Sequence, residues 1–228
     1  MKILHTSDWH LGHTLYNYDR SLEQQAFLKQ LARIAAEEKP DAMVVSGDIY
    51  HYSTPSATTQ KMYTDGMLEI HRACPEMTIV VTAGNHDSSS KLEIDSNLWN
   101  HFGVRVVGNI ERNQEEVNLE KHIVEVKDKE GNLKGYIIAV PHVYPQNFPM
   151  LDTETPREER QARFFQALQD EVEKMNVKRL PVVLMAHLSI EGSDRTGHDE
   201  TVGGIEYVPI SSMGEGYDYL ALGHIHCP

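Results

Sequence analysis

Short apolar runs alternate along this chain with stretches of helical periodicity, and this alternation limits the possible folds more than any other feature. The runs at 41–46 and 78–83 are typical of buried strands, and the apolar positions between 27 and 35 recur at helical spacing. Strands that alternate with helices predict an α/β fold with parallel strands. We expect strands at 2–7, 41–46, 78–83, 104–107, 121–127, 135–141, 180–186 and 219–222, and helices at 21–38, 58–72, 91–102 and through 165–175.

Composition narrows the class of protein. Hydrophobic residues make up 40% and charged residues 24% of the 228 residues, which is typical of a soluble globular domain and excludes disordered or collagen-like chains. No stretch approaches the roughly 20 apolar residues of a membrane-spanning helix. The first residues turn polar too soon for a signal peptide, and two cysteines suit a reducing compartment. We therefore expect a cytoplasmic protein without a membrane segment.

The net charge is acidic, because 34 Asp and Glu residues outnumber 21 Lys and Arg residues to give −13. Nucleic-acid binding usually requires a basic surface, so this balance argues weakly against it. The argument is weak because carboxylates that hold divalent cations can make a site locally positive while the whole chain stays negative.

Polar clusters follow five of the expected strands. In open α/β sheets, the loops beyond the carboxyl ends of the strands form the ligand-binding crevice. One such cluster is a weak signal, because Gly-Asp is a common turn and His-x-His recurs by chance among 13 histidines. Their shared position at strand ends predicts that they meet in one site. The clusters are Asp8-Trp9-His10, Gly47-Asp48, Gly84-Asn85-His86-Asp87, His187 and Gly223-His224-Ile225-His226.

The side chains in these clusters are carboxylates, imidazoles and an amide, with no cysteine. Such a donor set suits divalent ions such as manganese, iron or zinc. A single carboxylate such as Asp48 can bridge two ions. Two ions about 3.5–4 Å apart can stabilise both the attacking and the leaving oxygen of a displacement at phosphorus.

The order of these motifs from Met1 to His226 resembles the calcineurin-like metallophosphoesterase family. The stretches ILHTSDWHLGHTLY, VVSGDIYHYSTPS, GNHDSS and YLALGHIH are similar to the SbcD-type nucleases within it. The resemblance implies two divalent ions, Mn2+ first, with Fe2+, Zn2+ or Mg2+ as alternatives. It implies one ion held by Asp8, His10, Asp48 and His226, and a second held by Asp48, Asn85, His187 and His224, with Asp48 bridging.

The same resemblance implies catalytic roles for three further residues. His86 would stabilise the transition state or protonate the leaving oxygen, and Asp87 would orient the His86 ring. His51 would lie near the substrate phosphate. A hydroxide activated by the two metals would cleave phosphodiester bonds in DNA. The implied activities are 3′–5′ double-strand exonuclease and single-strand endonuclease, in DNA repair and recombination.

The fold implied is an αββα sandwich with two mixed sheets, formed by residues 1–228 as one nuclease domain. SbcD-type proteins continue into a capping domain and a partner-docking segment, so the resemblance implies that this chain ends before both. The implied partners are DNA, an SbcC-type coiled-coil ATPase and a second copy of the chain. The copy would pack against the regions 58–72 and 91–102, through the apolar residues Met62, Leu92, Leu98, Trp99 and Phe102.

Other interpretations stay open. The chain could be a different phosphoesterase on this fold, acting on a phosphoprotein, a cyclic nucleotide or a small phosphodiester. It could also be a non-catalytic scaffold for an ATPase. The apolar residues of the implied dimer face could equally form ordinary core. Four histidines match no motif and are predicted to be surface or packing residues: His71, His101, His122 and His142.

Overall fold

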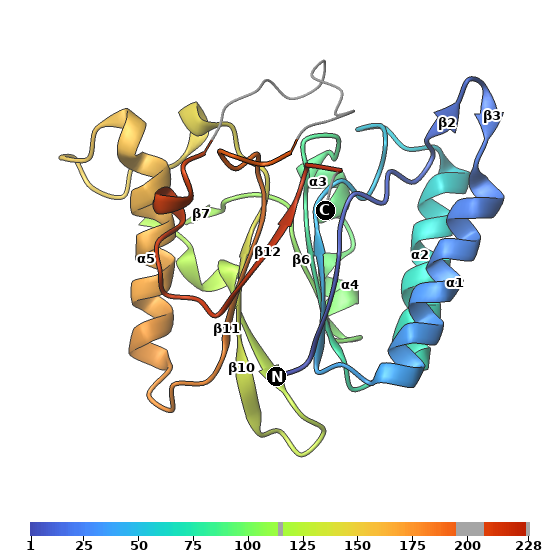
Figure 1. The fold of residues 1–228 in the computed structure, drawn as a ribbon, viewed down its shortest axis with the longest axis horizontal. Helices are drawn as coiled ribbons and strands as arrows, with labels where there is room; N and C mark the ends of the chain where they lie inside the picture. The colour runs from blue at the N-terminus through green and yellow to red at the C-terminus, as the bar shows by residue number, and fades with distance from the viewer. Residues whose placement is uncertain (114–115, 195–207, 227–228) are drawn as a thin grey trace.

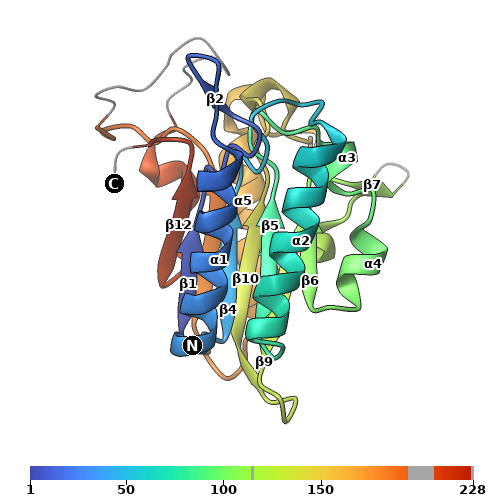
Figure 2. The same ribbon diagram turned by 90° about the vertical axis from the view of Figure 1, so that its right-hand side faces the viewer.

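The computed structural model describes residues 1–113, 116–194 and 208–226, and within them the chain forms an α/β sandwich of four layers (Figure 1). Helices α1 (Ser21–Glu38) and α2 (Ala57–Ala73) form one outer layer, and α5 (Arg160–Met175) forms the other. Two sheets lie between them. Figure 2 shows α1 and α2 side by side across the face of the first sheet. The αββα sandwich is therefore confirmed.

The first sheet has the strand order β1-β4-β5-β6 in the described residues, and all its pairs are parallel. A mixed sheet was expected here. The strands are parallel because each connection crosses over through helices: α1 follows β1, α2 follows β4, and two short helices follow β5. The strands are β1 (Ile3–Thr6), β4 (Ala42–Ser46), β5 (Thr78–Thr82) and β6 (Val104–Val107).

The second sheet has the order β12-β11-β10-β9 in the described residues and is mixed. β9 runs antiparallel to β10 because a tight turn joins them, whereas β10, β11 and β12 are parallel. The Asp128 carboxylate stabilises the turn by accepting hydrogen bonds from the amides of Glu130 and Asn132, at 3.1 and 2.8 Å. The strands are β9 (Ile123–Lys127), β10 (Leu133–Val140), β11 (Val182–His187) and β12 (Tyr219–Gly223).

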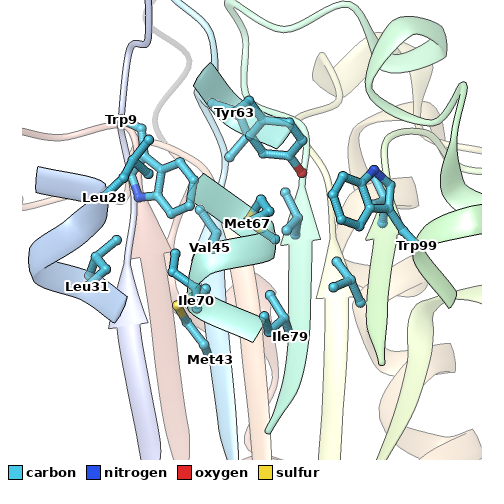
Figure 3. Close-up of a cluster of buried hydrophobic side chains, with 14 of the residues drawn as sticks. Trp9, Leu28, Leu31, Met43, Val45, Tyr63, Met67, Ile70, Ile79 and Trp99 are labelled. Carbon is cyan, nitrogen blue, oxygen red and sulfur yellow. The ribbon is translucent and has the colours of Figure 1, made fainter. Parts of the chain in front are cut away.

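The apolar core follows the two-residue period of the strands. Met43 and Val45 of β4 face α1 and α2, where Figure 3 shows them among Trp9, Tyr63 and the aliphatic side chains of both helices. Val44 points the opposite way and packs between the sheets, against side chains of the second sheet. The outer face of the second sheet packs against the phenylalanines of α5. Apolar contacts on both faces of each sheet therefore hold the layers together.

The expected helix at 91–102 is instead two short helices, α3 (Ser89–Leu92) and α4 (Ser96–Asn100). Between them the amide of Ser96 donates to the Glu93 carbonyl at 2.9 Å, a turn of three residues instead of four. The Glu93 carboxylate accepts from the Gly108 amide at 2.7 Å and pairs with Lys121 Nζ at 2.7 Å. These contacts with distant segments account for the break, which the local sequence does not reveal.

The implied dimer face must also be corrected. Met62, Leu92 and Trp99 are buried in the core between the first sheet and its helices, so they are not available to a second copy. Phe102 packs partly against the same core. Leu98 is 58% exposed, and Ile94 beside it in the sequence is 78% exposed.

Shorter elements join these layers. The hairpin of β2 (Thr14–Leu15) and β3 (Tyr18–Asp19) precedes α1, and β7 (Arg112–Asn113) pairs with β8 (Glu116–Val117). Among the described residues, no helix is both long enough and apolar enough to span a bilayer. The remaining turns are the 3-10 helices η1 (Leu119–His122), η2 (Pro145–Asn147), η3 (Arg157–Glu159) and η4 (Ile210–Met213).

Candidate metal centre

The predicted site residues converge at the carboxyl ends of the two sheets. In the first sheet, Asp8 follows β1, Asp48 follows β4 and Asn85 follows β5. In the second sheet, His187 ends β11 and His224 follows β12. Because neighbouring parallel strands end at the same edge, residues far apart in the sequence meet there. The expectation that these clusters form one site is therefore met by the geometry.

The backbone at this edge is strained. Asp8, His10 and Asp48 have positive φ angles of 54°, 43° and 50°, and His224 has 92°. A residue other than glycine in this region costs of order 1–3 kcal/mol, and such residues concentrate at functional sites. Hydrogen bonds hold the strained loops together, because the amides of Asp8 and His10 donate to the carbonyls of Gly47 and Asp48, both at 3.0 Å.

One group of donors forms around Asp8, His10 and His226, whose ligand atoms lie within 4.8 Å of one another. The two imidazole Nε2 atoms of His10 and His226 face each other at 3.2 Å, and Asp8 Oδ1 lies 3.4 Å from His226 Nε2. Asp48 Oδ2 lies 3.6 Å from His10 Nε2. These atoms belong to the four residues expected to hold the first ion.

A second group forms around Asp8, Asp48 and His187, again within 4.8 Å. Asp48 Oδ2 lies 3.4 Å from His187 Nε2. Asn85 Oδ1 lies 3.0 Å from His187 Nε2 and 3.0 Å from His224 Nδ1. The structure thus brings together the four residues expected at the second ion, and the same oxygen of Asp48 approaches both groups.

Electrostatics at Asp48 and His187 favour a cation. Burial alone would raise the pKa of the Asp48 carboxyl, but the hydrogen bond and charge of His187 outweigh it and hold the pKa well below its usual range. Burial alone would lower the pKa of His187, yet the Asp48 carboxylate raises it to about 9. A carboxylate that draws a proton into a buried site also draws a metal ion, which displaces the proton when it binds.

Several of these side chains are held by a second hydrogen bond. His187 Nδ1 donates to the Ser46 carbonyl at 2.8 Å, which leaves Nε2 directed at Asp48 and Asn85. The His224 amide donates to both oxygens of Asp8, each at 3.1 Å. Metal-binding histidines in proteins are commonly oriented in this way by a carbonyl or a carboxylate.

His86 lies beside Asp48, with its Nε2 4.0 Å from Asp48 Oδ2. Its ring is oriented by the His51 carbonyl, which lies 2.9 Å from Nδ1. The expected support of this ring by Asp87 is corrected: the Asp87 carboxylate is bonded to backbone amides of neighbouring loops. Asp87 therefore holds the loop that carries His86 instead of the ring itself. The amides are those of Ile49, Tyr50 and Gly84, at 3.0, 2.9 and 2.8 Å.

His51 lies on the outer side of this centre. Its ring stacks on His86 with centroids 5.4 Å apart and approaches His10 at 5.5 Å. The ring of His13 lies 4.4 Å away on its other side. Burial and the neighbouring rings of His13 and His86 lower the pKa of His51 to about 4. His51 is therefore placed where a phosphate at the metal centre would be within reach.

A groove of about 1490 Å³ runs over these residues. Pockets for small ligands usually measure about 300–1,000 Å³, so this groove has room for a larger substrate. It extends from the donor groups across the first turn of α1, where Arg20 and Glu23 line it, to Tyr52 on the far side of His51.

The sequence analysis missed the role of Gln24. Ser21-Leu22-Glu23-Gln24 was interpreted as a capping box, but the Ser21 hydroxyl donates to Asp19 Oδ1, and the N-cap residue, Arg20, makes no side-chain capping bond. The buried Gln24 side chain instead accepts from the Gly12 amide and donates to the His10 carbonyl, both at 3.0 Å. It holds the loop that carries His10, which a local helix-start pattern could not reveal.

The donor set fits divalent ions. Carboxylate oxygens, imidazole nitrogens and an amide oxygen converge without cysteine, which is the chemistry expected for manganese, iron or zinc. Asp48 is 2% exposed and its oxygens face imidazole nitrogens, so its buried charge already has polar partners on several sides. Residues arranged in this way can hold two ions at the edge shared by the sheets.

Comparison with known proteins bears on this site. The sequence matches the Calcineurin-like phosphoesterase family over residues 1–228. It is 32% identical to the SbcD subunit of the SbcCD nuclease of Rhodobacter capsulatus, over 100% of this chain and 58% of that protein. It is 26% identical to the same subunit of the Escherichia coli K12 nuclease, over 99% and 56%, and 28% identical to that of Bacillus subtilis, over 100% and 57%.

The chain thus spans a little over half the length of the curated relatives that it matches. The family match extends over the whole chain and includes every residue of the metal centre. Together with the αββα sandwich and the two donor groups, this match shows that the chain belongs to the calcineurin-like phosphoesterase family.

Proposed function

We propose that this chain is the nuclease domain of an SbcD-type protein and hydrolyses phosphodiester bonds in DNA. The observation that carries the proposal is the position of Asp48 between the two donor groups, with Oδ2 3.6 Å from His10 Nε2 and 3.4 Å from His187 Nε2. Its relatives are named as nuclease subunits, which supports DNA as the substrate. The family implies divalent metal ions, and the donor set supports Mn2+ as the ion used.

The proposed ligand sets are those implied by the sequence. When bound, two ions supply the positive charge that activates a water molecule and stabilises the charge developing on the phosphate. The carboxylate of Asp48 lies where it can hold both ions. The first set is Asp8, His10, Asp48 and His226, and the second is Asp48, Asn85, His187 and His224.

His86 is the proposed proton donor to the leaving oxygen. The His51 carbonyl accepts from Nδ1, which leaves Nε2 directed toward the centre near Asp48. His51 adds a contact to the substrate phosphate from the outer side of the groove. Asp87 fixes the loop that carries His86. A proton supplied by a positioned side chain contributes about 10²–10⁴-fold to a rate.

The whole-protein activities extend the same proposal. They are 3′–5′ exonuclease action on double strands and endonuclease action on single strands, gated by an SbcC-type ATPase partner in the cytoplasm. The names of the relatives refer to one component of a two-component nuclease, which supports the partner. The exposed Ile94 and Leu98 support contact with a second copy at α3 and α4.

The test is cleavage of end-labelled single- and double-stranded DNA with Mn2+, beside bis(4-nitrophenyl) phosphate as a generic diester. His86→Ala should keep both metals and lower hydrolysis about 10²–10⁴-fold, because it removes only the proton donor. His101→Ala, at an exposed position after α4, is the matched control. Metal loss in His86→Ala would contradict the assigned role. Hydrolysis of the generic diester without any cleavage of DNA would contradict the proposed substrate.

A further inference from the structure

A second cavity of about 250 Å³ lies beside the metal centre, among residues that follow β5, β6 and β10. Asn85 lines both this cavity and the groove over the metal centre. The His142 amide donates to the Ala83 carbonyl at 2.8 Å, which ties the end of β10 to the end of β5 next to the cavity. The volume equals about eight water molecules at about 30 Å³ each, enough for one ring system but small for a whole nucleotide.

The lining is polar but carries little charge. Among the described residues around it there is no lysine or arginine, so the cavity is poorly suited to a phosphate group. The Asp87 carboxylate is taken up by backbone amides. Ser89, Asn109 and Asn147 contribute a hydroxyl and two amides, which can both donate and accept hydrogen bonds. Such groups match the edge of a neutral heterocycle.

Aromatic rings lead from this cavity toward the metal centre. The ring of Tyr144, which is 41% exposed, meets the ring of His142 at 5.0 Å and 82°. His142 stacks in turn on His224, with centroids 6.4 Å apart and an angle of 27°. The sequence predicted that His142 is a surface or packing residue, but it lies between the second donor group and this cavity. The exposed ring of Tyr144 offers a surface on which a planar ligand can stack.

We propose that this cavity, the base pocket, binds the base of a nucleotide next to the phosphate that is cleaved. The inference rests on the proposed nuclease function. Asn85 forms the wall between the base pocket and the metal centre, so a phosphodiester at the centre and the base of an adjoining nucleotide can be bound together. Stacking on Tyr144 tolerates any base, and the amides of Asn109 and Asn147 bind its edge.

The first experiment measures kcat/KM with Mn2+ for a thymidine dinucleotide and for the two versions that each lack one base. Loss of the base that occupies the pocket should lower kcat/KM about 5- to 150-fold, which corresponds to the 1–3 kcal/mol of one stacked base. If wild-type protein cleaves all three equally well, the base pocket is overturned while the proposed nuclease function stands. If it hydrolyses bis(4-nitrophenyl) phosphate but no nucleotide, the proposed function fails, and the base pocket with it.

The second experiment compares Tyr144→Ala with Tyr144→Phe, which keeps the ring. Tyr144→Ala should lose most of the preference for the dinucleotide over its abasic version, and Tyr144→Phe should retain it. Binding of a 2-aminopurine oligonucleotide to chelator-treated protein gives a readout that is independent of hydrolysis. Stacking should quench its fluorescence in wild type and Tyr144→Phe, and much less in Tyr144→Ala. Equal quenching in all three proteins, or an equal fall in hydrolysis of both substrates, would overturn the proposal.

Discussion

Two fully buried histidines lie in different regions of the second sheet and have opposite protonation. His187 ends β11 at the metal centre, and His122 lies in the core beneath α5. Both rings have Nδ1 bonded to a backbone carbonyl, that of Ser46 at 2.8 Å and that of Ala139 at 2.7 Å. Yet the pKa of His187 is raised to about 9, and the pKa of His122 is lowered to about 4.

The difference lies on the other side of each ring. His187 Nε2 faces the Asp48 carboxylate at 3.4 Å, whereas His122 Nε2 is buried without a hydrogen-bond partner among the described residues. The His122 ring instead packs edge-on against Phe164, with centroids 5.3 Å apart. Burial penalises the charged imidazole in both places, and only a close carboxylate reverses that effect. The partner of a buried histidine therefore decides whether the residue serves packing or can serve a cation site.

The largest effect is expected from Asp48→Ala, which removes the partner that distinguishes His187. At least one metal should be lost, and hydrolysis should fall by about 10³-fold or more, since both proposed ligand sets share this carboxylate. The pKa of His187 should fall toward that of His122, because burial then acts without a counter-charge. Metal content by mass spectrometry and histidine titration by NMR measure both effects. Two fully occupied metal sites in this variant would disprove the bridging role.

The pH dependence of stability tests the other half of the comparison. The pKa of His122 is about 4 in the folded protein against 6.5 for an ordinary histidine, so the unfolded chain takes up the proton first. Stability from the neutral ring is complete above pH 6.5 and is lost as the pH falls from 6.5 to 4. The loss is of order 3 kcal/mol, at 1.36 kcal/mol per pKa unit.

His122→Asn isolates this effect, because the amide can still donate to the Ala139 carbonyl but does not titrate. The free energy of unfolding is measured by denaturant titration at several pH values in chelator-treated protein. Other buried histidines and Asp87 contribute equally to both proteins and cancel in the difference. Wild type should lose more stability than the variant between pH 6.5 and 4. Parallel pH profiles would show that burial does not keep His122 neutral.

A smaller effect is expected from Gly84→Ala, which tests how closely the chain packs around Asp48. A Cβ atom at Gly84 would overlap the carboxylate and the amide of Asp48, neither of which can move without disturbing the donor groups. We expect a loss of about 1–3 kcal/mol of stability, as for other overpacked sites, together with weaker metal binding.

Gly131→Ala is the control for this substitution. Gly131 lies in the β9–β10 turn with a φ of 82° and open space around it, so its replacement tests backbone strain alone. That substitution should cost about 1 kcal/mol and leave metal affinity unchanged, because a left-handed residue is the only source of strain. Equal losses of stability and metal affinity in the two variants would show that the metal edge is not closely packed.

Much of the site was predictable, because each donor stands where an apolar strand ends. Asp8, Asp48, Asn85, His187 and His224 all follow or end strands that the sequence pattern placed within about two residues. The role of each donor stays a prediction that the metal-binding experiments test. The partners of Asp87 and Gln24 were not predictable, since these side chains bond to the backbone of loops far away in the sequence.

The sequence by itself determined the order of strands and helices, the α/β class and the polar clusters at the strand ends. These features follow from periodicity and turn residues, which act over a few neighbouring positions. Only the tertiary structure decided that helix 91–102 breaks at Glu93, that Met62 and Trp99 are core, and that His142 lies between two cavities. Those outcomes depend on contacts between segments distant in the chain, whose energies no local pattern records.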